Sequence, residues 1–253
     1  MRTRHFLAVS SVAVLLGLAL VGGLEAAGPR WRFDFEQGVV FSGYNNIAIP
    51  GDTGTRFSLS RDFKTAAGYY FRARLTWRFA ERHSLSALFA PLKLSASGMA
   101  PFPIFFFGAE IPAGAPVTGT FKFNSYRLSY RYALVRSEKL DIGLGFTAKI
   151  RDAAIALNSG SIRAEKTNVG FVPLLNFKIE YRLSPAVSLL LDADALAAPQ
   201  GRAEDVLTAV VVRLSPAILL RAGYRFVEGG ADNKVVYNFT WIHYASVGLL
   251  IDF

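Results

Sequence analysis

The sequence contains no cysteine and only three histidines among its 253 residues. Without cysteine, the chain can have neither a disulfide framework nor thiol chemistry. Acidic residues are also scarce relative to basic ones, 19 against 28, so the net charge is +9. A positive excess of this size fits a nucleic acid, an anionic lipid or an anionic solute as partner. Composition alone does not separate these classes.

A second absence concerns long apolar runs. After the N-terminal region, no stretch reaches the roughly 18 residues that a membrane-spanning helix needs. The N-terminal region itself has two arginines, an apolar run over residues 6–21, and small residues at Ala26 and Ala27. This order is typical of a secretory signal peptide rather than a retained anchor. We therefore predict a signal peptide over residues 1–27 and one domain over residues 28–253. Export from the cytoplasm argues against nucleic acid as the partner.

What the sequence does contain is repeated alternation of apolar and polar residues. In YYFRARLTWRF (69–79), apolar residues such as Phe71 and Trp77 share one face, and three arginines share the other. The segments 140–151 and 174–183 alternate in the same way. A period of two is typical of a β-strand with two different faces. The charged face would meet solvent in a water-soluble sandwich and the lumen in a membrane barrel.

Aromatic residues favour the barrel, because they gather near the ends of the apolar faces. Girdles of this kind lie at the two interfaces of a bilayer. The predicted girdle residues are Trp31, Phe33, Trp77, Phe79, Tyr130, Tyr132, Tyr181, Tyr224, Phe226, Phe239, Trp241 and Phe253.

Connection lengths favour the barrel as well, since short turns on one side and long loops on the other are the outer-membrane pattern. Tight turns are predicted at 81–83, 136–138, 184–185 and 215–216, and longer loops at 42–67, 97–118, 157–167, 199–203 and 229–234. The strands between them are expected at 31–41, 68–79, 84–96, 119–134, 139–156, 168–183, 186–197, 204–214, 217–228 and 235–253. We therefore predict an all-β fold: a single ten-stranded antiparallel transmembrane β-barrel with short periplasmic turns, long extracellular loops and periplasmic termini.

The last ten residues, YASVGLLIDF, alternate up to Phe253. The last strand is expected to pair with the first, which leaves no open edge. On these features the sequence resembles the Gram-negative outer-membrane β-barrel proteins, a broad class. In that class a C-terminal strand that ends in an aromatic residue is the assembly signal. The resemblance implies an outer-membrane location and contact of Phe253 with the barrel assembly machinery.

Charged residues occupy the faces that should point into the lumen. Asp34 and Glu36 should neighbour the arginines of the second strand. Register counted from the tight turns predicts three further cross-strand pairs: Lys178–Asp192, Asn176–Asp194 and Arg131–Asp141.

We predict that these charged residues form a network of ion pairs that fills the lumen, because polar groups away from bulk water need partners. A narrow path for anions is the alternative, since positive charge is in excess. The network comprises Asp34, Glu36, Arg72, Arg74, Arg78, Arg127, Arg131, Asp141, Lys149, Arg151, Lys178, Glu180, Arg182, Asp192, Asp194, Arg221 and Arg225.

The aspartates at 192 and 194 are candidates for catalysis, because they share one strand face near the expected extracellular mouth. Such a pair can act as a base. The ten-stranded omptin proteases set one opposite an aspartate–histidine pair. Here His5 lies in the signal peptide, His83 in a turn, and His243 on the outward face beside Trp241. We predict no catalytic residue, no metal site and no cofactor.

The loop segment APFPIFFFGAEIPAGAPV (100–117) is unusually apolar for an exposed position. It could extend the barrel wall, fold as a lid onto residues 45–59, or line the mouth of a route for a hydrophobic ligand. Its apolar cluster comprises Phe102, Ile104, Phe105, Phe106 and Phe107.

Basic residues in or beside the loops are expected to contact lipopolysaccharide phosphates, because anionic head groups attract them with about 1 kcal/mol each. These residues are Arg56, Arg61, Lys64, Lys122, Arg163, Lys166 and Lys234. Taken together, the sequence predicts an outer-membrane protein with a structural or surface-binding role and a largely plugged, net basic lumen. A narrow channel for small anionic or hydrophobic solutes is the alternative, and an enzyme at the extracellular mouth comes third.

Overall fold

The computed structural model describes residues 30–199 and 201–253. The predicted signal peptide, residues 1–27, lies outside the described residues. Within the described part of the chain, no helix is long and apolar enough to cross a membrane. The regular structure there consists of β-strands.

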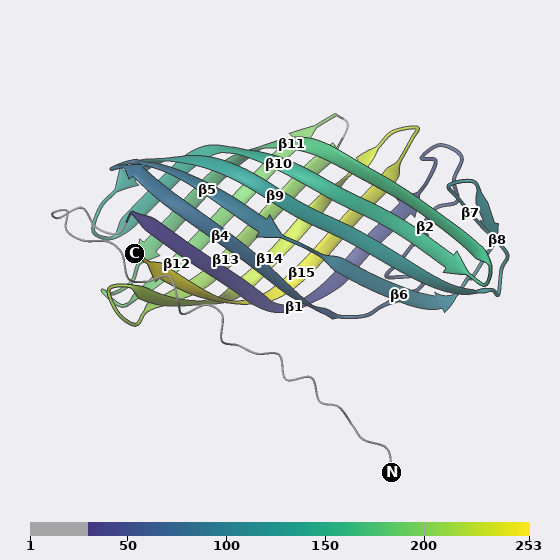
Figure 1. Cartoon of the computed structure of the whole chain (residues 1–253), viewed down its shortest axis with the longest axis horizontal. Helices are drawn as coiled ribbons and strands as arrows, with labels where there is room; N and C mark the ends of the chain where they lie inside the picture. Colours follow the sequence, from purple (N-terminus) through teal and green to yellow (C-terminus); the bar gives the residue numbers. More distant parts are fainter. Residues whose placement is uncertain (1–29, 200) are drawn as a thin grey trace, which may run out of the picture.

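Ten long antiparallel strands, one of them interrupted, close into a barrel in the described residues, which confirms the predicted fold class (Figure 1). The interrupted strand consists of β5 and β6, which are separated by Pro91 and Leu92 and both pair with β9. The barrel strands are β1 (Trp31–Ala48), β4 (Gly68–Ala80), β5 (His83–Ala90) with β6 (Lys93–Met99), β9 (Pro116–Arg136), β10 (Leu140–Ser159), β11 (Ile162–Arg182), β12 (Val187–Ala198), β13 (Gly201–Arg213), β14 (Ile218–Asp232) and β15 (Tyr237–Asp252). Short strands in the loops are β2 (Phe57–Ser58), β3 (Lys64–Thr65), β7 (Ile104–Phe106) and β8 (Ala109–Ile111).

The first and last strands close the barrel, as predicted. β1 pairs with β15 from Arg32 opposite Asp252 to Ala48 opposite Tyr237, with a bulge next to Ser42. The backbone N–H of Phe253 donates to the carbonyl oxygen of Trp31 at 2.9 Å, and the reverse bond has the same length. Pairing along the whole seam leaves neither edge strand open.

The two ends of the barrel differ. We call the end that carries Phe253 and the tight turns at residues 81–82, 137–139, 183–186 and 214–217 the turn end. The opposite end, which carries β7 and β8, is the lid end (Figure 1). The four tight turns agree with the predicted ones.

Three of the five predicted long loops are wrong, because the strands continue into them. β10 and β11 run on to a two-residue turn at Gly160 and Ser161, in place of a loop over 157–167. Gly160 has a φ of +58°, the left-handed conformation that a two-residue hairpin favours. The segments 199–203 and 229–234 also lie largely within strands.

Strand β10 shows why these strands extend so far. In its first half, Leu144 is exposed on the outer wall and Lys149 is buried on the inner wall. In its second half the pattern reverses, since Ile155 and Leu157 are buried on the inner wall and Asn158 is exposed outside. The barrel wall therefore faces an apolar medium over one stretch and an aqueous medium over the next.

Candidate functional site

The inner wall carries a network of buried ion pairs, and Asp205 is its centre. Asp205 is 2% exposed and projects inward from β13. Its Oδ2 accepts from Arg72 at 2.8 Å and from Arg127 at 2.5 Å, and its Oδ1 accepts from Arg225. These arginines come from β4, β9 and β14, so a single carboxylate joins strands from across the lumen.

Glu36 of β1 is a second node. Its Oε2 accepts from Arg221 and from Arg225, each at 2.8 Å, and its Oε1 accepts from Arg225 Nε at 2.8 Å. Arg221 also donates to Asp34 at 2.7 Å. Arg225 thus connects Glu36 to Asp205, and the two nodes form one continuous network.

The aspartates of β12 join the same network. Asp194 accepts from Arg127 at 2.6 Å, from Asn176 at 2.7 Å and from Thr147 at 2.6 Å. Asp192 accepts from Arg131 at 2.5 Å and from Arg74 at 2.8 Å. Such pairs are strongly destabilising when one partner is lost, because the other charge stays buried.

The predicted cross-strand register is correct at β11 and β12. Lys178 lies opposite Asp192, and Asn176 lies opposite Asp194. The ion pairs differ from these positions, however, since Lys178 binds Glu180 at 2.7 Å while Asp192 takes arginines from other strands.

The predicted pairing of Arg131 with Asp141 is wrong. The turn lies at residues 137–139, further along the chain than a turn centred on Arg136, and this displaces the β9–β10 register by several residues. Arg136 lies opposite Asp141, and Arg131 lies opposite Gly145. The register of Asp34 and Glu36 is as predicted, since they lie opposite Arg74 and Arg72 of β4.

Asp205 is the node that sequence reasoning missed. Asp205 falls within the strand predicted at 204–214, but it is absent from the predicted charge network. A usable signal is present, because Asp205 and Arg213 are an even number of residues apart in that strand and so share one face. The remaining predicted network residues lie at its two margins: Arg78, Asp141 and Arg182 towards the turn end, and Lys149 and Arg151 towards the lid end.

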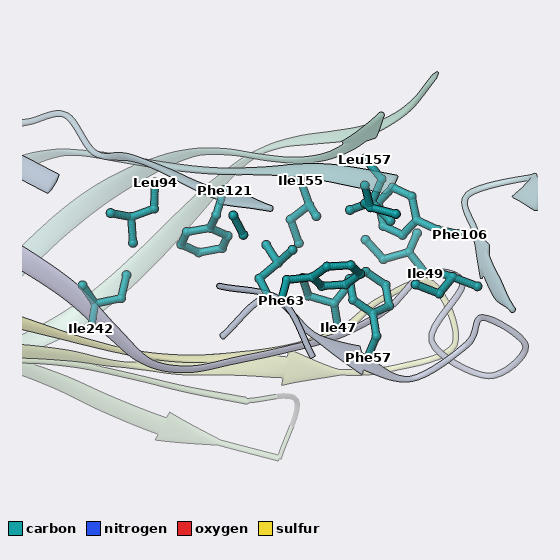
Figure 2. Packing of buried hydrophobic residues seen from close by; sticks show 14 of the residues in the cluster. Ile47, Ile49, Phe57, Phe63, Leu94, Phe106, Phe121, Ile155, Leu157 and Ile242 are labelled. Carbon is teal, nitrogen blue, oxygen red and sulfur yellow. The ribbon is translucent and has the colours of Figure 1, made fainter. Parts of the chain in front are cut away.

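Above the network, the lid end is filled by an apolar cluster rather than by charges (Figure 2). We call residues 49–63 and 100–115, which supply much of it, the lid. The ring of Phe106 meets that of Phe57 edge-on at 6.0 Å, and both are fully buried. They pack with inward residues of the wall, among them Ile47, Phe121 and Leu157.

The two halves of the lid are also hydrogen-bonded to each other. The backbone N–H of Thr55 donates to the carbonyl of Phe105, and the N–H of Phe105 donates to the Thr55 hydroxyl, both at 2.9 Å. The N–H of Phe107 donates to the carbonyl of Ile49 at 2.7 Å. Of the three placements predicted for residues 100–117, the structure shows the second, in which this segment is folded onto residues 45–59.

Members of the predicted apolar loop cluster have different surroundings. Ile104 and Phe106 are buried, and Phe102 packs against the cluster from its edge. Phe105 is half-buried. Phe107 is 47% exposed, and the ammonium of Lys166 lies 5.0 Å from its ring centre.

Two cavities flank the charge network. The one at the turn end, about 410 Å³, is lined largely by charged residues such as Arg78, Arg131, Asp141 and Arg182. The one at the lid end, about 620 Å³, has a mixed lining that includes Phe123, Lys149 and Arg151. Among the described residues, no group of three or more His, Asp or Glu side chains could hold a metal ion.

Aromatic residues form contiguous rows on the outer wall. Near the turn end, Trp31 stacks on Trp77 at 5.6 Å, and the row continues through Phe79 and His83 to Tyr132. Towards the lid end, contacts link Tyr224 with Phe226, His243 with Trp241 and Tyr237 with Phe239. Of the other predicted girdle residues, Tyr181 and Phe253 are exposed near the turn end, Tyr130 bonds to His83, and Phe33 is half-buried.

The outer wall between these rows is exposed and apolar, with residues such as Leu128, Phe146 and Val247. The fold matches that of the outer membrane protease OmpT from Escherichia coli with a TM-score of 0.54 and 9% identity, over 91% of this chain and 99% of that one. The described part of the chain has the fold of an outer-membrane β-barrel protein.

Other solved structures are similar to the barrel at lower scores. An outer membrane channel from Pseudomonas putida F1 matches with a TM-score of 0.44 and 11% identity, over 92% of this chain and 99% of that one. Neisserial surface protein A matches with a TM-score of 0.36 and 15% identity, over 90% of this chain and 100% of that one. No family model and no curated protein sequence matches the chain.

A first prediction concerns the lipid-facing wall of the barrel. Replacing Leu144, which is 49% exposed on β10, by arginine should lower the free energy of unfolding by about 2–4 kcal/mol, because the charge would enter the bilayer. Asn158→Arg is the matched control, since Asn158 is exposed on the same face of β10 beyond the apolar stretch, and it should be neutral. Urea unfolding in lipid vesicles measures both. Equal costs at the two positions would contradict the assignment of the apolar stretch to the bilayer.

Of the two histidines in the described residues, neither meets the aspartate pair. His83 begins β5 near the turn end, where its Nδ1 bonds to the Tyr130 hydroxyl at 2.7 Å. His243 lies on the outer wall, stacked on Phe41 at 5.0 Å. Both aspartates, which were predicted as members of the lumen charge network, lie buried in it.

The loop cations have varied environments. Lys122 pairs with Asp152 at 2.8 Å, and Arg61 pairs with Asp62 at 3.0 Å. The guanidinium of Arg56 lies 4.2 Å from the ring centre of Tyr237. Lys64, Arg163 and Lys234 are exposed.

Proposed function

We propose that the barrel is a non-conducting, non-catalytic outer-membrane protein that binds a ligand in its lid end, with its turn end and both termini in the periplasm. The observation that carries the proposal is the charge network with the lid above it. Ion pairs from β1, β4, β9, β12, β13 and β14 meet in the lumen, and the apolar cluster covers them. An ion would have to pass both.

The non-catalytic part of the proposal rests on how the carboxylates are used. A general base must be free to take a proton. Asp192 and Asp194 each accept two or more charge-assisted or neutral hydrogen bonds from Arg74, Arg131 and Arg127 and their neighbours. Their oxygens are thus already occupied by donors of the barrel itself, so neither carboxylate is free to take a proton from a substrate.

Conductance across planar bilayers tests the closed lumen. The refolded barrel is expected to give no steady current. The double variant Arg127→Ser with Asp194→Ser removes both partners of one ion pair, leaves Asp205 with Arg72 and Arg225, and should raise the current. This variant also shows that inserted barrels are detected. A steady anion-selective current through the unaltered protein would contradict the proposal.

That contrary result would support the second candidate, a narrow path for anions. One observation favours it: the cavity at the turn end is lined by more basic than acidic side chains, including Arg78, Arg131, Lys178 and Arg182. A basic vestibule concentrates anions. The ion pairs of the network lie between this vestibule and the cavity at the lid end.

The surface-binding role extends to lipopolysaccharide. We propose that exposed cations at the lid end, such as Lys64, Arg163 and Lys234, contact its phosphates, because cations near an anionic surface are attracted to it. Assembly is proposed to begin at β15 and Phe253, whose pairing with β1 completes the barrel.

A further inference from the structure

The barrel wall is incomplete on one side of the lid end. The pairing of β11 with β12 begins at Leu175 opposite Ala195 and ends at Arg182 opposite Ser188. Residues 162–174 of β11 pair with β10 alone, and β12 beyond Ala195 pairs with β13 alone. Pro173, at the margin of this gap, has no N–H to offer a neighbouring strand. Residues 170–174 lie opposite the stretch of β10 whose outer face is apolar, and an unpaired strand edge in an apolar medium is costly.

The cavity of about 620 Å³ lies behind this gap. Its lining includes Phe171, Val172 and Pro173 of β11, which lie along the unpaired part of that strand. On β12 it reaches Leu196 and Ala198. Its volume is that of a small-molecule site.

A buried cation without an anionic partner points into the cavity. Lys149 is 3% exposed on the inner wall and lines the cavity. Among the described residues, none of the ion pairs within 4.0 Å includes its ammonium, which instead lies 4.7 Å from the ring centre of Phe123. Arg127, directly opposite on β9, already binds Asp194 and Asp205. An ammonium buried in this position is stabilised when an anion joins it.

Arg151, two residues along the same face of β10, adds a second donor. It donates to the side chain of Asn168, while its buried Nε has no hydrogen-bond partner. Gly170 lies opposite, and a Cβ there would come within 3.1 Å of the Arg151 guanidinium. Glycine thus leaves space for this side chain to lie against β11, beside the gap.

The rest of the lining is mainly apolar. Phe121, Phe123, Ile155, Leu196 and Val227 all contribute to it. Two carboxylates also line it, Glu204 of β13 and Glu228 of β14, and Glu228 is engaged by Arg202 at 2.7 Å. The site therefore combines two donors for an anion with an apolar space that lies beside the gap between β11 and β12.

We propose that this cavity binds an anionic amphiphile, whose carboxylate or phosphate meets Lys149 and Arg151 and whose hydrocarbon chain lies among the apolar residues and passes through the gap between β11 and β12. The inference rests on the proposed binding role and names its ligand class. The same chemistry is supplied by a free long-chain carboxylate and by a lipid of the surrounding leaflet.

The test uses the full refolded barrel in a neutral detergent with cis-parinaric acid, a fluorescent long-chain carboxylate, as probe. The double variant Lys149→Gln with Arg151→Gln should bind the probe at least about tenfold more weakly, because two charge-assisted contacts are lost. Lys178→Gln is the matched control, since Lys178 is a lumen cation that lines the other cavity, and it should leave the Kd unchanged. The methyl ester of the probe should bind the unaltered protein no better than the acid binds the double variant. A heat-dependent shift on a detergent gel verifies that each variant is folded.

Equal binding of the acid to the unaltered protein and the double variant would overturn the proposal, as would ester binding as tight as that of the acid. A second arm identifies the source of the ligand. Lipid that stays with the unaltered barrel through detergent exchange, is lost from the double variant and competes with the probe would indicate a leaflet lipid. Probe binding without retained lipid would indicate a free carboxylate. Current through the unaltered protein would overturn the proposed closed lumen and leave these binding results standing.

Discussion

Replacing Asp205 by alanine is expected to lower the free energy of unfolding of the barrel by about 3–5 kcal/mol. The carboxylate accepts hydrogen bonds from Arg72, Arg127 and Arg225, and all of these side chains are buried. Without it, three guanidinium groups are left close together with less negative charge between them. Like charges at this separation repel strongly in a medium of low dielectric constant.

The matched control is Asp232→Ala, because Asp232 is exposed at the end of β14. It should change the free energy of unfolding by less than about 0.5 kcal/mol. Urea titration in lipid vesicles, followed by tryptophan fluorescence, measures both variants. A loss at Asp205 no larger than that at Asp232 would mean that the network does not stabilise the barrel.

Phe106→Ala is the second substitution with a large expected effect, a loss of about 3–5 kcal/mol. The ring is fully buried between the two halves of the lid, where it meets Phe57. Truncation would leave a cavity that the hydrogen-bonded strands β7 and β8 cannot close. Phe107→Ala, one residue along, removes a ring that is 47% exposed and should cost less than about 1 kcal/mol.

Comparing the Phe106→Ala and Phe107→Ala variants shows whether the segment acts as a structural lid or as an exposed binding patch. Protease cleavage of the folded barrel reports lid opening, and it should accelerate for Phe106→Ala but not for Phe107→Ala. If both variants were cleaved at the rate of the unaltered protein, the lid would be held by contacts other than the apolar cluster.

Much of the barrel could be predicted from the sequence, because a strand with one apolar and one polar face requires apolar and polar residues to alternate. The period of two in residues 69–79 and 140–151 gave β4 and β10. Short turns fixed the register of β11 against β12, so that Lys178 was correctly set opposite Asp192. Once the position of a turn is known, the backbone pairing leaves little freedom for the register of the two strands that it joins.

The rest depended on features that alternation does not carry. The turn between β9 and β10 lies at residues 137–139 rather than on Arg136, so Arg131 lies opposite Gly145 and not Asp141. Asp205 stands at the polar start of the strand predicted at 204–214 and is absent from the predicted network, although polar residues are what an inner wall requires. The long loops were overestimated because beyond Arg151 the apolar residues change to the inner face, as Leu157 does. A strand whose apolar face switches sides looks irregular when it is read as a single pattern.

The seam between β1 and β15 has a consequence for how fast the barrel forms. Arg32 and Asp252, whose side chains pair at 2.5 Å across it, are 220 residues apart in the chain. Every other neighbour in the wall is reached through a hairpin or a single loop, so those contacts can form by local search. At the seam, two segments that are distant in the sequence must meet. The chain loses the entropy of closing this long loop before the hydrogen bonds of the seam form. Folding rates fall as contacts become less local, so closure of this seam should be the slow step of barrel formation.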